Sequence, residues 1–389
     1  MTNLRGNWNY PTAIRFGAGR IAELPDACRT LGIERPLLVT DPGLAGLPMI
    51  ARAVQACREA GLAIGVFSEV KANPVEDNVV TGVTTYRNGK HDGVIAFGGG
   101  SALDTGKAIA LMVGQSRPIW DFEDREDWYT RVNVAGMAPT IGVPTTAGTG
   151  SEVGRASVIT DLRDHTKKII FHPKMQPALV IADPELTLGL PPHITAAVGM
   201  DALSHNIEAY CSPFYHPMAE GIALEGMRLI KEWLPIAVRE GSNIEARAHM
   251  MVASTMGATA FQKGLGAMHS LSHPCSAHLN THHGLTNAVV MPYVLAWNRS
   301  ALDAKMSRLA AFLGLPHASF DGVLDWIVDL RRTIGVPHTL AELGVQEAHA
   351  DAFAPQAFDD PSTSGNPLPM SREDFAQLYR RCIRGELSR

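Results

Sequence analysis

The stretch GVIAFGGGSALDTGK, residues 93–107, decides the fold of this 389-residue chain. An apolar, β-branched run ends in three glycines, and a helix-like segment begins at Ser101. Glycine lets the backbone turn sharply and approach a ligand closely, and a helix start presents free N–H groups and the positive end of its dipole. We therefore predict a pyrophosphate-binding turn over Gly98, Gly99, Gly100 and Ser101. The alternative is a turn that serves geometry alone, because the stretch is neither a GxGxxG fingerprint nor a Walker A loop.

Strand-like and helix-like segments alternate on both sides of this turn. The strand-like runs are PLLVTD (36–41), AIGVFSEV (63–70), GVIAFGGG (93–100), TIGVPTT (140–146) and ALVIADP (178–184). The helix-like segments cover residues 47–60, 75–88 and 101–113. This alternation predicts a parallel sheet covered by helices on both faces, with ligands at the carboxyl ends of the strands. The runs 157–161 and 167–171 predict a separate β-hairpin.

Polar residues follow several of these runs. Asp41 ends the first run, where a carboxylate accepts hydrogen bonds from a ribose 2′-hydroxyl and repels a 2′-phosphate, which favours NAD over NADP. A turn-forming aspartate before Pro42 is the competing interpretation. The loop PTTAGTGSE, from Pro144 to Glu152, offers hydroxyls and glycines to a phosphate or to the nicotinamide ribose. Lys167, on the predicted hairpin, can reach back towards the same groups.

The second half of the chain has a different character. From about Pro191, long segments rich in Ala, Leu and Met replace the strand-like runs and predict amphipathic helices. They cover residues 194–211, 218–239, 244–262, 302–313, 320–334 and 371–386. Because prolines interrupt both kinds of element in DPELTLGLPP, we predict two domains, residues 1–187 and 188–389. The polar stretch 359–369 predicts a mobile loop.

A carboxylate and several imidazoles in this second half suggest a metal site. Asp201 and His205 lie four residues apart in a helix-like segment, so both side chains project from one face. A histidine cluster follows at His269, His273, His278, His282 and His283. One carboxylate with three imidazoles suits a divalent metal such as Fe²⁺ or Zn²⁺. Surface or hydrogen-bonded core histidines are the competing interpretation, and spacing alone does not choose between the two adjacent histidines at 282 and 283.

The composition excludes several classes of function. A net charge of −5 gives no basic surface for nucleic acid or for an anionic membrane. The first residues contain no apolar signal core, and no run is long enough to span a membrane. The five cysteines lack CxxC spacing and fit reduced thiols better than a disulfide framework. We expect a cytoplasmic protein that binds neither nucleic acid nor membrane.

Over residues 8–300 the chain resembles the iron-containing (group III) alcohol dehydrogenases. The motifs are VTD (39–41), NP (73–74), GGGSALDTGK (98–107), PTTAGTGSEV (144–153), DP (183–184), GMDALSHNIEAY (199–210) and HHGLTNAVVMPYVLAWN (282–298). The resemblance implies a Rossmann-like α/β nucleotide-binding domain followed by an all-α domain, an architecture shared with the dehydroquinate synthases. It is looser beyond about residue 300.

The resemblance also implies site residues. The implied metal ligands are Asp201, His205, His269 and His283, and His273 matches a further active-site histidine near the nicotinamide. The implied cofactor-contacting positions are Asp41, Gly98, Gly99, Gly100, Ser101, Asp104, Thr145, Thr146 and Lys167. The chain departs from the family at His282, where proline is usual, and at WDFEDREDWYTRV (120–132), which is longer and more charged than the usual segment.

These features predict a metal-dependent dehydrogenase that transfers a hydride between a small alcohol or aldehyde and NAD(H), in a cleft between the domains. Fe²⁺ is the first choice of metal and Zn²⁺ the second, and the family implies a homodimer or larger homo-oligomer. His273 either relays a proton to solvent or packs against and orients a ligand. Three alternatives remain: a metal-independent reductase of the maleylacetate reductase type, where the residue matching Asp201 is usually not an acid; a lyase related to dehydroquinate synthase; and a non-catalytic NAD- or metal-binding protein.

Overall fold

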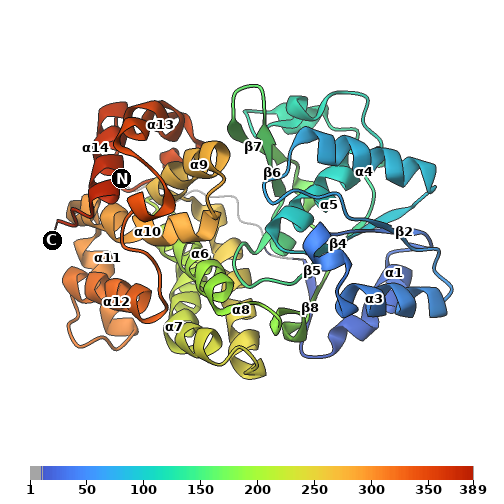
Figure 1. The fold of residues 1–389 in the computed structure, drawn as a ribbon, viewed down its shortest axis with the longest axis horizontal. Helices are drawn as coiled ribbons and strands as arrows, with labels where there is room; N and C mark the ends of the chain where they lie inside the picture. Colours follow the sequence, from blue (N-terminus) through green and yellow to red (C-terminus); the bar gives the residue numbers. More distant parts are fainter. Residues whose placement is uncertain (1–9, 11, 389) are drawn as a thin grey trace. The chain divides into compact units, whose positions relative to one another are not determined.

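The computed structural model describes residue 10 and residues 12–388 of the chain. It divides into two compact units, one over residues 10–189 and one from Leu190 onward. The first unit combines strands and helices, and the second consists of helices joined by short connections (Figure 1). The α/β and all-α character predicted for the two halves is confirmed. The domain boundary expected after residue 187 lies close to this division.

A six-stranded parallel sheet forms the centre of the first unit. Its strands are β1 (Ala13–Phe16), β2 (Pro36–Val39), β3 (Gly65–Phe67), β4 (Gly93–Gly98), β5 (Thr140–Pro144) and β8 (Leu179–Ala182). They lie in the order β1-β8-β5-β4-β2-β3, and every paired strand is parallel. Five of them coincide with predicted runs, whereas the short edge strand β1 was not predicted.

Helices cover both faces of this sheet. Helices α1 (Leu24–Thr30) and α3 (Pro48–Glu59) pack on one face, against side chains such as Leu38. Helices α4 (Glu76–Asn88) and α5 (Gly100–Met112) pack on the other face, against Leu37 and Val39 among others. Because successive side chains of a strand point to opposite faces, one continuous apolar run supplies both cores.

The predicted β-hairpin is also confirmed. Strands β6 (Ala156–Asp161) and β7 (Thr166–Phe171) pair antiparallel and form a separate two-stranded sheet. Their inward side chains Ile159 and Ile170 are fully buried in the core that α5 shares with the main sheet. The hairpin is therefore anchored to the same helix that follows the glycine turn.

The second unit is built around one buried helix. Helix α6 (Pro192–Cys211) contacts α7 (Pro217–Arg239), α8 (Ile244–Ala260) and α10 (His283–Trp297). Nearly all of its residues are buried, which is typical of a helix surrounded by others. The remaining long helices are α9 (Ala267–Leu279), α11 (Arg299–Phe312), α12 (Phe320–Thr333), α13 (Glu347–Asp359) and α14 (Arg372–Arg384).

The stretch 359–369, predicted as a mobile loop, instead forms a short helix and is held by hydrogen bonds to the helical unit. Asp360 caps a short 3₁₀ helix, Pro361–Gly365, by accepting a hydrogen bond from the N–H of Ser362. Asn366 exchanges hydrogen bonds with the buried Asn298 and accepts another from the N–H of Ala267. Polar composition predicted a loop, but its polar groups are satisfied inside the protein.

The five cysteines are all buried, and none is in a disulfide. Cys28 and Cys57 lie in the first unit, and Cys211, Cys275 and Cys382 lie in the second. Among the described helices, none combines the length and apolarity required to cross a bilayer.

Candidate metal centre and nucleotide site

Three of the four predicted metal ligands converge in the interior of the helical unit. Asp201 and His205 lie one turn apart on α6, and His269 lies near the start of α9. Their exposed fractions are 2%, 5% and 2%. One ligand atom from each side chain lies within 4.8 Å of the other two. Three buried ligand atoms this close together, contributed by two helices, make this a candidate metal site.

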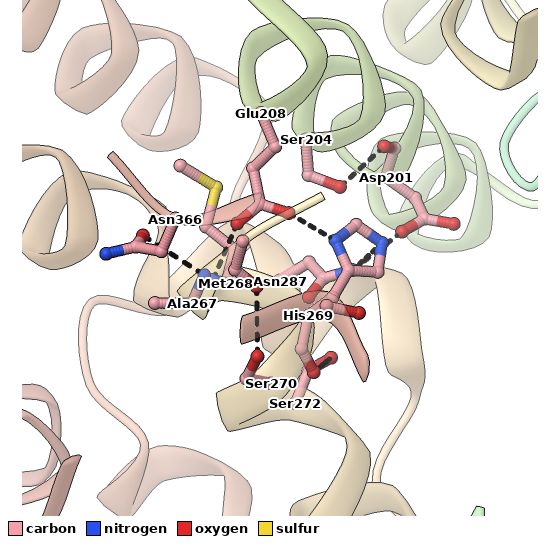
Figure 2. Close-up of polar contacts among 12 residues, drawn as sticks. Asp201, Ser204, Glu208, Ala267, Met268, His269, Ser270, Ser272, Asn287 and Asn366 are labelled. Carbon is pink, nitrogen blue, oxygen red and sulfur yellow. Dashed lines mark hydrogen bonds and ion pairs between the residues drawn. The ribbon is translucent and has the colours of Figure 1, made fainter. Parts of the chain in front are cut away.

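Glu208 fixes the orientation of His269 (Figure 2). Its Oε2 accepts a hydrogen bond from Nδ1 of His269 at 2.6 Å, and its Oε1 accepts another from the N–H of Met268 at 2.7 Å. With Nδ1 carrying the proton, Nε2 is left bare for a metal. Burial alone lowers the pKa of His269, but the hydrogen bond and charge of Glu208 raise it overall.

Sequence reasoning missed Glu208, although a signal was present. Asp201, His205 and Glu208 are spaced by four and three residues, so they lie on one face of α6. Three charged or ionisable residues on one face of a buried helix are a pattern typical of a common binding site.

The fourth predicted ligand, His283, lies at the start of α10 on the edge of this cluster. Its Nε2 is 3.9 Å from Oδ1 of Asp201, and its ring centroid is 5.3 Å from that of His269. Its Nδ1 lies 3.1 Å from the hydroxyl of Ser272. The neighbouring His282 instead caps α10, since its Nδ1 accepts a hydrogen bond from the N–H of Leu285. The two adjacent histidines, which spacing alone does not distinguish, therefore have different partners, and His283 as the ligand stays a prediction.

A glycine brings the start of α10 against α6. A Cβ atom on Gly284 would lie 2.6 Å from the carbonyl oxygen of Ala197 and 2.8 Å from Cβ of Asp201. Real Cβ atoms are not found so close to other heavy atoms. Only glycine therefore permits the approach that carries His283 to Asp201.

His273 lies one turn beyond His269 on α9 and is paired with a carboxylate. Its ring stacks on that of His283 with the centroids 5.3 Å apart, and its Nδ1 is 2.6 Å from Oδ2 of Asp360. Burial raises the pKa of Asp360, but the charge and hydrogen bond of His273 lower it overall. No motif pointed to Asp360, because it lies in the polar stretch after α13, far from the histidines along the chain.

The donor set fits a divalent cation. It contains one carboxylate and imidazole nitrogens, which are the ligands that Fe²⁺ and Zn²⁺ take in proteins. The ligand atoms of three residues converge in the interior, and Glu208 holds one imidazole in the tautomer that leaves Nε2 bare. Hydrogen-bonded partners of this kind are typical of metal-binding histidines.

In the first unit, the predicted nucleotide residues gather where β2 and β4 end. The chain leaves β2 for β3 on one side and returns to β4 on the other, which makes this the switch point of the sheet. Gly98 has φ of +152°, a conformation that favours glycine, and a Cβ there would lie 3.6 Å from Oδ2 of Asp41. Oδ1 of Asp41 accepts hydrogen bonds from the N–H groups of Gly43 and Leu44. Asp41 therefore forms the turn and also faces the glycines.

The second polar loop lies beside the glycine turn. The N–H of Thr145 donates to the carbonyl of Gly98 at 3.0 Å. A Cβ on Gly99 would lie 3.4 Å from Cγ2 of Thr146, and one on Gly100 would meet the side chain of Thr149. Residues 98–100 and 144–149, far apart in sequence, thus form one surface of small groups. The hydroxyl of Ser101 is directed elsewhere, to the carbonyl of Ala72.

Asp104 and Lys167, also predicted to contact the cofactor, contact other parts of the first unit. The carboxylate of Asp104 accepts hydrogen bonds from the hydroxyl of Ser151 at 2.6 Å and from the N–H of Val158 at 3.0 Å, and forms an ion pair with Lys107. These contacts join α5 to the second loop and to the hairpin. Lys167 lies on β7 opposite Thr160, whose N–H donates to the carbonyl of Pro74 in the NP motif.

Comparisons with known proteins agree with this geometry. The model for "Iron-containing alcohol dehydrogenase" matches residues 11–184, and that for "Fe-containing alcohol dehydrogenase family, C-terminal" matches residues 195–383. The chain belongs to the iron-containing alcohol dehydrogenase family. It is therefore an oxidoreductase that acts as an alcohol dehydrogenase.

Similar members of the iron-containing alcohol dehydrogenase family align over nearly their whole length. A 4-hydroxybutyrate dehydrogenase from Cupriavidus necator is 38% identical, covering 96% of this chain and 99% of the relative. An NAD-dependent methanol dehydrogenase from Bacillus methanolicus is 34% identical, covering 97% and 100%. A crystal structure of a 1,3-propanediol oxidoreductase superposes with a TM-score of 0.92 at 32% identity, covering 97% and 100%.

Proposed function

We propose that this alcohol dehydrogenase interconverts small alcohols and aldehydes with NAD(H) and one divalent metal, held by Asp201, His205, His269 and His283. The observation that carries the proposal is the convergence of three buried ligand atoms within 4.8 Å, with Glu208 fixing one imidazole. Fe²⁺ is our first choice, in keeping with the family, and Zn²⁺ accepts the same ligands.

NAD is the proposed cofactor of the first unit. The glycine turn at the end of β4 and the loop at 144–149 offer N–H groups and hydroxyls to a pyrophosphate. The carboxylate of Asp41 beside Gly98 supports a preference for a free ribose hydroxyl over a 2′-phosphate. The methanol dehydrogenase relative is named as NAD-dependent.

When bound, the metal lowers the pKa of an alcohol hydroxyl or polarises an aldehyde carbonyl, and the nicotinamide carries the hydride. The residues of the chain orient these groups and move the proton. Glu208 holds His269, and Ser272 contacts Nδ1 of His283. His273, paired with Asp360, accepts the alcohol proton at Nε2 and passes it towards solvent. The carboxylate of Asp360 stabilises the charged imidazole during that transfer.

The names of the relatives guide the choice of substrate. They include dehydrogenases of 4-hydroxybutyrate, methanol and 1,3-propanediol, all of which carry a primary hydroxyl on a short chain. We therefore propose a short primary alcohol, a diol or a hydroxy acid as the substrate of this chain. The shared fold does not select among them.

A metal-independent reductase of the maleylacetate reductase type is the second candidate. Asp201, His205 and His269 converge here with buried ligand atoms, and this favours the metal-dependent enzyme. A lyase of the dehydroquinate synthase type would yield no net NADH, so the assay below separates it from both.

The test is NADH formation at alkaline pH with methanol, 1,3-propanediol and 4-hydroxybutyrate. The protein is first stripped with a chelator and then given Fe²⁺ or Zn²⁺. We expect activity only after metal is restored, with NAD⁺ preferred over NADP⁺. Full reductase activity in the stripped protein would move the assignment to the metal-independent branch, and no turnover of any alcohol or aldehyde would contradict both.

A further inference from the structure

Asn287 faces the candidate metal ligands and has no role in the account given above. It lies on α10 one turn after His283 and is fully buried. Its Nδ2 is 2.9 Å from Oδ1 of Asp201, 3.3 Å from Nε2 of His269 and 3.2 Å from Nε2 of His283. Figure 2 shows Asn287 beside His269 and Asp201.

The chemistry of these neighbours fixes which end of the amide faces the site. Oδ1 of Asp201 is a carboxylate oxygen that can only accept, and it lies 2.9 Å from the amide nitrogen. Acceptors need a donor opposite them, so the NH₂ end, and not the carbonyl oxygen, must point inwards. Oδ1 of Asn287 is buried without a hydrogen-bond partner in the described part of the chain.

Another buried asparagine of the same helical unit shows what a purely structural role looks like. Asn298, which ends α10, donates to the carbonyl of Val294 and exchanges hydrogen bonds with Asn366 at both ends of its amide. Each polar contact found for Asn287 is instead with an atom of a candidate metal ligand. These contacts point to the metal centre as the reason for the presence of Asn287.

We propose that Asn287 is a positioning residue of the metal centre, which acts by donating a hydrogen bond from Nδ2 to Oδ1 of Asp201. This bond fixes the direction of the carboxylate lone pairs. Ligating carboxylates are generally held by such hydrogen bonds, and losing the partner weakens metal binding. The inference rests on the metal centre proposed above and adds to it a positioning residue besides Glu208.

Two substitutions test the donated hydrogen bond. Asn287→Leu keeps the size of the side chain but has no donor, and Asn287→Asp keeps the shape but sets an acceptor against Asp201. We expect each to raise the dissociation constant for Zn²⁺ about 10- to 100-fold. The constant is measured on the full chain by competition with a chromophoric chelator, and bound zinc per chain is counted by elemental analysis.

Thr286→Val is the matched control. Thr286 is the preceding residue of α10, is fully buried and bonds Thr281 and the carbonyl of His282, away from the ligand atoms. It should leave zinc affinity unchanged, while circular dichroism shows that each variant is folded. If the Leu variant does not fold, the Asp variant alone carries the test.

Two outcomes overturn the inference while leaving the metal centre standing. One is a folded Leu variant with the zinc affinity of the parent. The other is an Asp variant that binds zinc as tightly as the parent or more tightly, which would make the oxygen of this side chain a ligand. A parent protein that binds no Zn²⁺ would instead contradict the metal centre itself, and this inference with it.

Discussion

At the scale of single residues, Glu208 acts on the candidate metal centre through His269 and is not itself a proposed ligand. Its two oxygens accept one hydrogen bond each, from the imidazole of His269 and from the N–H of Met268. Both donors are buried, so the carboxylate satisfies groups that would otherwise lack partners.

The first prediction concerns Glu208→Gln. A glutamine has only one acceptor oxygen. Its NH₂ group would therefore lie opposite either the N–H of Met268 or the Nδ1 proton of His269, and two donors repel each other. We expect metal affinity to fall about 10- to 100-fold, measured by chelator competition. Glu225→Gln is the control, because Glu225 lies on α7 and pairs with Arg228 at the surface. Equal affinities in the two variants would show that Glu208 does not orient His269.

The second prediction concerns the pair formed by His273 and Asp360. His273→Gln removes the group that moves the proton, so we expect kcat to fall by about 10²- to 10⁴-fold. Metal content should not change, because His273 is not among the four proposed ligands. Steady-state kinetics and elemental analysis on the same preparation check both statements. An unchanged kcat would leave His273 with a packing role, and a loss of metal would make it part of the metal centre.

At the scale of elements, the close approach of α6 and α10 depends on Gly284. The third prediction is that Gly284→Ala destabilises the protein by about 1–3 kcal/mol, because the added methyl group meets backbone and cannot be accommodated without a shift. It should also weaken metal binding, since the shift moves His283 away from Asp201. Chemical unfolding and zinc competition measure the two effects.

Gly221→Ala is the control for that substitution. Gly221 lies within α7, and a Cβ atom there would have no neighbour within 4 Å. Alanine at such a helical position should stabilise the protein by about 0.5–1 kcal/mol. Opposite signs for the two glycines would tie the effect to packing; destabilisation by both would point to a general intolerance of change in this unit.

The elements also show how far the sequence leads. Apolar runs and glycine predicted five strands of the main sheet, the hairpin and α6 with Asp201 and His205 on one face. Helices α9, α10 and α13 were not delimited; each has a proline inside it, although α7, which also contains one at Pro235, was predicted. Glu208 and Asn287 share a helix face with predicted ligands, whereas Asp360 reaches His273 through the packing of separate elements, which spacing along one segment does not encode.

At the scale of the whole molecule, the proposed ligands divide between the units. The metal residues all lie in the helical unit, and the nucleotide residues all lie in the α/β unit. A ligand that binds the folded state stabilises it by about 2.7 kcal/mol at a hundred times its dissociation constant. Each ligand should therefore protect its own unit first.

The fourth prediction states this for amide hydrogen exchange. Zn²⁺ should slow exchange in α6, α9 and α10, whereas NAD⁺ should slow it at 98–101 and 144–149. Mg²⁺ prefers oxygen ligands and, at the concentration of Zn²⁺, should slow neither. Protection by Zn²⁺ confined to the α/β unit would contradict the proposed ligands, and NAD⁺ protection absent from both loops would contradict the nucleotide site.

The burial of the cysteines provides a second way to measure how each ligand protects its unit against opening. No thiol among the five is exposed: two lie in the α/β unit and three in the helical unit. An alkylating reagent can therefore modify them only when the surrounding structure opens. The alkylation rates of Cys28 and Cys57 therefore report the opening of the α/β unit. Those of Cys211, Cys275 and Cys382 report the opening of the helical unit. The native cysteines thus serve as reporters, and no cysteine has to be introduced by mutation.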